Sequence, residues 1–311
     1  MRTIPSGKPP KPANHHWWPR SLSKQWAGSD GGVSQLSWDG SEVRSNPSNF
    51  GAIRNAHHLT RGNDSPWNAT FEPVFDKADN TFPSLTEWLL RLNAKRAGRD
   101  TFDDRFEAKP LSQERRLELA ECLASLIVRS PRSRNNIKIT IESYLAVDRT
   151  SGYSVDKTLI AANMHSSQGV VSKTISGGGK FVVLISDRDE LICGDGFLHN
   201  FPIGTDRSIS PRCIIPILPS VAILYARPIS YRPQPELITM LLRPNEVRFL
   251  NDIVQVYSCK RLFFRSQRPK LISKFTKCEH MELAYHSHPW LDQLIEAAGR
   301  FLPRSKGSAG Q

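Results

Sequence analysis

The feature that most constrains the fold is a cluster of short runs of β-forming residues between positions 181 and 225. The run Phe181–Ile185 has the length of one buried strand, and Cys213–Leu218 and Val221–Tyr225 follow it, separated by a turn at Pro219-Ser220. Such strands are apolar on both faces, so other elements must cover both faces of the sheet that they form. The cluster therefore predicts a buried sheet in the second half of the chain.

The strongest helical pattern lies in the first half, from Gln113 to Arg129, and can supply part of that cover. We expect Pro131 to end this helix, because the residue before a proline avoids helical geometry. The apolar positions that fall on one stripe of the helix are Leu117, Ala120, Leu123, Ala124 and Ile127.

Further helices are expected on either side of the strand cluster. Ser84-Leu85-Thr86-Glu87 fits a capping box, which predicts a helix over Ser84–Arg96 after a separate first helix over Thr70–Ala78. The β-branched residues of Ile137–Leu145 are compatible with a helix or a strand. A last helix is predicted over Pro244–Tyr257, with its proline near the first helical position.

The N-terminal region combines a short helix with a β-ribbon. Pro19 favours a helix over Arg20–Trp26, and the apolar residues around Asp39-Gly40 predict a hairpin over Val33–Arg44 with a type I′ turn. Arg261–Phe264 is predicted as a last strand.

Together these patterns predict an α/β (α+β) fold. Its helical first half packs with a small mixed sheet from the second half, and the N-terminal ribbon is added to them. We expect a single domain over residues 15–301, between a disordered basic arm at residues 1–14 and a disordered polar tail at residues 302–311.

The formal net charge of +12 over 311 residues favours a polyanionic partner, nucleic acid before an anionic membrane surface. No stretch reaches the roughly 18 uninterrupted apolar residues of a membrane span, so no span is predicted. The five cysteines lie far apart, in odd number and without CxxC spacing, unlike a secreted disulfide framework. We therefore expect reduced thiols and a cytoplasmic protein.

Several of these landmarks occur in an order that resembles a known family. Residues His15 to Pro19 read His-His-Trp-Trp-Pro, and the ribbon is followed by Asn46–Asn49. Further on come the arginine segment Val128–Arg132 and a Gly-Asp-Gly turn around Asp195. Over roughly residues 15–266 the chain resembles the bacterial HxxP family, a domain of unknown function. The resemblance implies an α/β fold and no established activity.

His16, in the HxxP motif, is the first candidate catalytic residue. Its imidazole, with an ordinary pKa near neutrality, is suited to general acid–base catalysis or to metal binding. In the alternative reading His16 hydrogen-bonds the following helix, while Trp17 and Trp18 pack in the core.

Glu72, Asp195 and Arg129 complete the candidate catalytic set. The two carboxylates would bind a divalent metal or orient His16, and Arg129 would hold phosphate oxygens. Structural roles stay open for each residue. Glu72 suits a helix's first turn and Arg129 a helix C-terminus, while Asp195 suits a turn between glycines. A divalent metal is thus a candidate cofactor, with no ligand set assigned.

A basic run near the C-terminus is the candidate nucleic-acid-binding region, with Phe263, Phe264 and Phe275 interleaved. It could follow a phosphate backbone while the aromatic rings stack on bases, or it could be a solvated face whose phenylalanines lie in the core. Its basic residues are Lys260, Arg261, Arg265, Arg268, Lys270, Lys274 and Lys277.

The leading hypothesis is a nucleic-acid-directed phosphodiester hydrolase, because such chemistry needs a proton-transfer group and positive charge on the phosphate. A stress or phage-defence effector is the biological context considered for it. The alternative is a non-catalytic module that binds nucleic acid or protein, with a structural HxxP motif. Whether the four candidate catalytic residues meet in space separates the two hypotheses.

Overall fold

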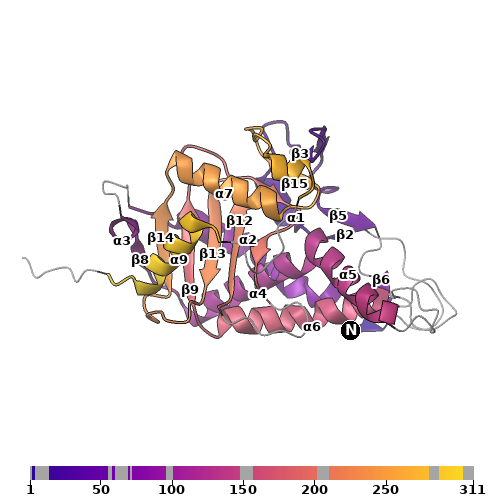
Figure 1. Ribbon diagram of the computed structural model, residues 1–311, viewed down its shortest axis with the longest axis horizontal. Helices are drawn as coiled ribbons and strands as arrows, with labels where there is room; N and C mark the ends of the chain where they lie inside the picture. Colours follow the sequence, from indigo (N-terminus) through magenta and orange to yellow (C-terminus); the bar gives the residue numbers. More distant parts are fainter. Residues whose placement is uncertain are drawn as a thin grey trace, which may run out of the picture.

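The computed structural model describes residues 14–54, 72–95, 101–147, 157–201, 210–279 and 287–303, with three further two-residue strands. Its centre is a six-stranded sheet in the order β11-β12-β13-β9-β14-β8, in which only β9 and β14 are parallel neighbours (Figure 1). The predicted runs near 181, 213 and 221 share this sheet, as expected. The strands are β8 (Glu107–Lys109), β9 (Lys180–Ile185), β11 (Leu198–His199), β12 (Arg212–Leu218), β13 (Val221–Ala226) and β14 (Leu237–Leu241).

Both faces of this sheet are covered. Alternate side chains of each strand point to opposite sides, so each face contributes to a separate core. On β9, Phe181 and Val183 belong to the larger core, whereas Val182 and Leu184 belong to a second core. The helices of the larger core are α1 (Arg20–Gln25), α2 (Asp76–Arg91), α4 (Gln113–Arg129), α5 (Pro131–Val147) and α6 (Lys157–Ser176). Those of the second core are α7 (Pro244–Tyr257) and α9 (Pro289–Arg300), beside the short α3 (Phe102–Arg105). Figure 1 shows α7 along the top of the view and α6 along the bottom.

A second sheet contains the predicted ribbon. Its order is β10 (Cys193–Gly194), β15 (Arg261–Phe264), β3 (Val33–Ser37) and β4 (Glu42–Ser45), and it packs on α7 with α8 (Ser273–Thr276). The hairpin is confirmed, but its turn is not type I′, since that turn needs positive φ at both central residues. Here Gly40 has φ 83° and Asp39 does not share this conformation. Instead, the Asp39 carboxylate accepts a hydrogen bond from the Ser41 amide at 2.9 Å.

The remaining strands form two small sheets. One pairs β2 (Asn14–His16) with β5 (Ala52–Arg54), and the other has the order β1 (Arg2–Thr3), β7 (Ala69–Thr70) and β6 (His58–Leu59).

The prediction of two separate helices over Thr70–Ala78 and Ser84–Arg96 is wrong. Thr70 lies in β7, a short 3-10 helix η1 (Glu72–Val74) follows, and α2 then runs unbroken through Pro83. Ser84 does not cap a helix, and its hydroxyl donates to the carbonyl of Thr81 at 3.1 Å. The reason is the buried face of α2, which is continuous across the proline, so packing outweighs the lost backbone hydrogen bond. Its members are Ala78, Phe82, Leu85 and Leu89.

The helix α4 has the predicted bounds, and the Ser112 hydroxyl caps it by accepting from the Arg115 amide at 3.1 Å. Two details differ from prediction. Leu117 points to solvent with 45% of its surface exposed, and Pro131 also begins the next helix, α5. The ambiguous segment from Ile137 lies in α5 and is therefore helical.

The helix α7 and the strand β15 also have their predicted bounds. The segments expected to be disordered, 1–14 and 302–311, lie for the most part outside the described residues. None of the described helices combines the length and the hydropathy that a membrane span requires.

Candidate functional site

The HxxP motif begins in β2 and ends at the start of α1. His15 pairs with Ile53 of β5, and the amides of Trp17 and Trp18 both donate to the carbonyl of Gly51, at 2.8 and 3.2 Å. Gly51 has φ 67°, and a Cβ there would lie 2.5 Å from the Cβ of Trp18. Only glycine permits this close turn, and the turn fixes where the histidines emerge.

Both tryptophans of the motif are buried. The Trp17 ring lies 5.6 Å from Phe263, and Trp18 packs edge-on against Trp26 at 6.4 Å. The Trp26 indole in turn donates to the Ile217 carbonyl of the central sheet at 3.0 Å. The expectation that the tryptophans pack in the core is confirmed, and they anchor the motif to both sheets.

His16 lies partly buried, with its Nδ1 3.1 Å from the carbonyl oxygen of Phe50. A carbonyl can only accept a hydrogen bond, so Nδ1 carries the proton in this contact. In the neutral imidazole Nε2 is then the unprotonated nitrogen. The backbone thus selects the tautomer that a general base requires.

Arg129, at the end of α4, is buried and faces this motif. Its Nη1 and Nη2 donate to the two carboxylate oxygens of Asp79 at 3.0 and 2.6 Å, and Nη1 also lies 3.3 Å from the carbonyl of His16. The guanidinium lies 4.9 Å from the ring centroid of Phe75. Because Asp79 neutralises its charge, we assign Arg129 to positioning His16 instead of the predicted phosphate contact.

Glu72 lies in η1, immediately before α2. Burial raises the pKa of its carboxyl; the charges of His15, Arg129 and His16 oppose this shift, and that of Asp79 reinforces it. Glu72 therefore lies within electrostatic reach of both histidines and of the Asp79–Arg129 pair. We call these five residues, His15, His16, Glu72, Asp79 and Arg129, the HxxP cluster.

Asp195 follows β10 and is held by backbone groups of the segment before β15. Its carboxylate accepts from the amides of Cys259 and Lys260, at 2.7 and 3.1 Å, and its own amide donates to the Arg261 carbonyl at 3.1 Å. Burial raises its pKa, and these backbone hydrogen bonds oppose the shift. Asp195 thus joins β10 to the turn between α7 and β15, which matches its structural alternative.

The structure consequently brings together three of the four predicted catalytic residues, His16, Glu72 and Arg129. It adds His15 and Asp79, which sequence reasoning did not select. His15 could have been found as the neighbour of His16 in the motif. Asp79 carries no such signal, because only the packing of α2 on α4 shows that it faces Arg129.

All seven basic residues of the run from Lys260 to Lys277 are exposed, whereas its three phenylalanines are buried. The stacking role predicted for these rings is therefore wrong, and they pack in the core as the alternative reading had it. Arg265 pairs with Glu190 and Arg268 with Glu42. Five cations have no ion pair among the described residues: Lys260, Arg261, Lys270, Lys274 and Lys277.

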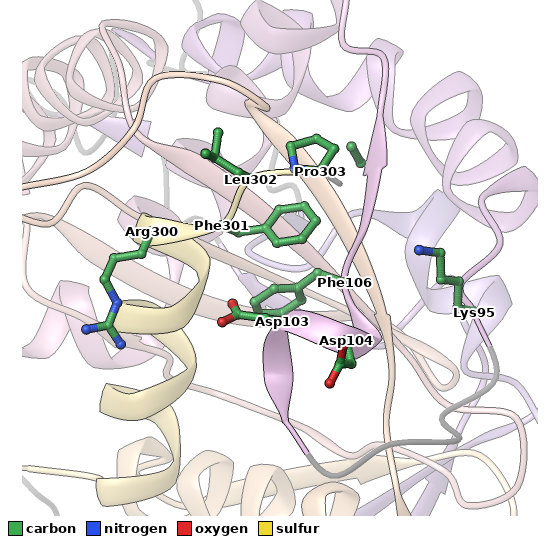
Figure 2. Close-up of a pocket in the computed structure, with 9 residues that line it drawn as sticks. Lys95, Asp103, Asp104, Phe106, Arg300, Phe301, Leu302 and Pro303 are labelled. Carbon is green, nitrogen blue, oxygen red and sulfur yellow. The ribbon is translucent and has the colours of Figure 1, made fainter. Parts of the chain in front are cut away.

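A cavity of about 590 Å³ lies at the opposite end of the view from β2, beside α3, β8 and the end of α9 (Figure 1). Figure 2 shows the rings of Phe106 and Phe301 at its centre, with Lys95 and the carboxylates of Asp103 and Asp104 around them. None of the predicted site residues lines it.

Among the described residues no group of three or more His, Cys, Asp or Glu side chains is arranged to hold a metal ion. No protein-family model matches the chain, and no curated protein or solved structure matches it either. The resemblance to the HxxP family stays a prediction, and function has to be inferred from the geometry of the sites.

Proposed function

We propose that the chain is a phosphodiester hydrolase acting on nucleic acid, with His16 and Glu72 as its proton-transfer pair. The observation that carries the proposal is that the Glu72 carboxyl lies within electrostatic reach of the His16 imidazole in the HxxP cluster. The backbone leaves Nε2 of His16 free of a proton in the neutral ring, and burial raises the pKa of Glu72. A ring nitrogen that can accept a proton, near a carboxyl that burial makes slower to ionise, is the kind of pair that general acid–base catalysis uses.

With RNA as substrate, cleavage begins with a transesterification. Nε2 of His16 removes the proton of a ribose 2′-hydroxyl, and the 2′-oxygen forms a new bond to phosphorus. The bond from phosphorus to the 5′-oxygen breaks, and the leaving oxygen takes the proton of the Glu72 carboxyl. This first step gives a 2′,3′-cyclic phosphate and a 5′-hydroxyl, with His16 protonated and Glu72 ionised. In the second step water attacks phosphorus while Glu72 takes one of the water's protons, the bond from phosphorus to the 2′-oxygen breaks, and His16 protonates that oxygen, which restores both groups and leaves a 3′-phosphate.

The rest of the HxxP cluster supports this pair. Arg129 ties the His16 carbonyl to Asp79 on α2, so it holds the motif against the helix that follows Glu72. Phe263 of β15 contacts Phe50 at 4.4 Å and Trp17 at 5.6 Å. The strand where the basic run begins is therefore packed directly under the motif.

The test is a cleavage assay on mixed RNA and on single-stranded DNA, with and without divalent metal. The variant His16→Asn keeps an N–H donor for the Phe50 carbonyl but has no ring nitrogen that can accept a proton. We expect it to lose about 10²- to 10⁴-fold in rate while its melting temperature stays the same. His165→Asn, on the exposed side of α6, is the matched control and should cleave normally.

A second candidate is a non-catalytic nucleic-acid-binding module. The exposed, unpaired cations of the basic run favour it, as does the use of Arg129 and Asp195 in internal contacts. Under this hypothesis the wild-type protein binds RNA without cleaving it under any metal condition, and His16→Asn binds equally well. That result would remove the hydrolase proposal.

A further inference from the structure

Two adjoining hollows run along the exposed side of α7. The first, of about 580 Å³, lies between α7 and α9 and is lined mainly by apolar and aromatic side chains, with Asp252 and Lys274 among them. The second, of about 650 Å³, shares Asp252 and extends to Lys270. We call the two together the α7 groove. Its volume suits a small planar ligand, and no residue of the HxxP cluster lines it.

The groove holds the aromatic surface that the basic run itself lacks. Phe249 is 39% exposed, and its ring lies 6.4 Å from that of Trp290 with a tilt of 40°. The Trp290 indole donates to Glu246 at 3.4 Å, and the Arg248 guanidinium lies 5.8 Å from the Phe249 centroid. These contacts orient both rings, so a flat ligand would meet a preformed stacking surface.

Asp252 lies where the two hollows meet. Burial raises the pKa of its carboxyl, with Arg248 opposing the shift. Among the described residues no hydrogen bond or ion pair reaches this carboxylate. A half-buried carboxylate that receives no hydrogen bond from the described residues has lost solvation free energy, and a ligand that offers N–H donors there would recover it.

The lining of the groove carries charges of both signs. Its charged residues are Asp189, Glu190, Asp252, Arg248, Lys270 and Lys274. Glu190 is already paired with Arg265. Lys274 lines the first hollow and Lys270 the second, and both belong to the unpaired cations of the basic run. An acidic peptide would be repelled by Asp252, and a basic peptide would be repelled by the lysines. A nucleotide suits charges of both signs, since its phosphates are anionic and its base carries N–H groups on a flat ring.

We propose that the α7 groove is a base-recognition site for single-stranded nucleic acid, with guanine preferred. The base stacks on Phe249 beside Trp290, and its adjacent N1–H and 2-amino donors face the two oxygens of Asp252. Lys270 and Lys274 hold the flanking phosphates. This site shares with the proposed function only the assumption that nucleic acid is the partner.

The test measures fluorescence anisotropy with labelled 2′-O-methyl octamers, which lack the attacking hydroxyl, so binding is followed without cleavage. The octamers are uridine with one central guanine, adenine or inosine. We expect the guanine octamer to bind about tenfold more tightly than the adenine octamer, with inosine between them because it lacks the 2-amino group. Asp252→Asn should reduce this preference to under about threefold, and the exposed control Asp187→Asn should keep it.

Two further variants test the aromatic ring of Phe249 and the positive charge of Lys274. Phe249→Ala should weaken the binding of all three octamers by at least about fivefold. The control Ile229→Ala changes an exposed apolar residue outside the groove and should leave their binding unchanged. Lys274→Ala should weaken the binding of all three octamers and make that binding less dependent on salt concentration. The control Lys24→Ala removes the same charge from α1 and should change neither. Melting temperatures of all variants show whether they are folded.

The inference is overturned if Asp252→Asn keeps the guanine preference, if Phe249→Ala binds as tightly as wild type, or if the wild type binds all octamers alike. These outcomes are separable from failure of the hydrolase. Equal affinity for all octamers together with His16-dependent cleavage would overturn only the proposed base-recognition site. Guanine-selective binding without cleavage would overturn only the proposed hydrolase activity.

Discussion

The HxxP cluster and the basic run use positive charge in opposite ways. In the cluster, Arg129 is buried, bound at both Nη atoms by Asp79 and held over the ring of Phe75. In the run, Lys270, Lys274 and Lys277 are exposed and have no ion pair among the described residues. A cation that a protein has already neutralised organises structure, whereas a solvated and unpaired cation remains available to a polyanion. Three predictions would break or sharpen this contrast.

The largest effect is expected for the buried cation. Arg129→Ala removes a fully buried side chain and leaves the partly exposed Asp79 without its partner, which should lower the free energy of unfolding by about 2–4 kcal/mol. Lys274→Ala should change it by less than about 0.5 kcal/mol, because an exposed lysine makes few contacts. Urea denaturation followed by circular dichroism measures both. Equal losses for the two variants would show that the contrast between the regions does not exist.

The next effect concerns the paired and unpaired members of the run itself. Replacing Lys270, Lys274 and Lys277 by Ala should lower the log–log salt slope of single-stranded nucleic-acid binding by about 2 units, since each lost phosphate contact removes about 0.7. Replacing Arg265 and Arg268 should lower it by less than about 1 unit, because Glu190 and Glu42 already bind these side chains. Anisotropy titrations over a range of salt concentrations test this. Unchanged slopes in both variants would make the run a solvated face without a nucleic-acid role.

The smallest effect is expected at Glu72. Burial places its folded-state pKa above the ordinary value, so the folded protein binds this proton more tightly than the unfolded chain. Stability is therefore lost as the pH rises from the ordinary carboxyl pKa through the raised one. Glu72→Gln cannot titrate, so at neutral pH it should be more stable than wild type, by less than about 1 kcal/mol.

On acidification this advantage of Glu72→Gln should shrink and disappear below the ordinary carboxyl pKa. Thermal melts from pH 4 to pH 8 follow the difference, with the exposed Glu87→Gln as control. A Gln variant that is less stable than wild type at neutral pH would mean that the charged carboxylate stabilises the fold, as a purely structural residue does.

The sequence by itself determined the elements whose signals are local. The strands β9, β12 and β13, the helices α4 and α7 and the ribbon follow from apolar periodicity and from turn and cap residues that lie within a few positions of one another. The same local signals identified His16 through its motif and identified the basic run through its composition. No comparable local signal led us to β14, α6 or α9.

The roles of individual side chains were decided only by the tertiary structure. The continuous α2 face keeps the helix intact through Pro83, and Leu117 is exposed although its spacing suggested burial. Asp79 lies opposite Arg129, while Asp195 is bound by amides of the turn at residues 259–260. Such outcomes depend on which side chains meet across long stretches of chain. Burial and pairing between distant segments then decide whether a charged group supports the fold or faces a ligand.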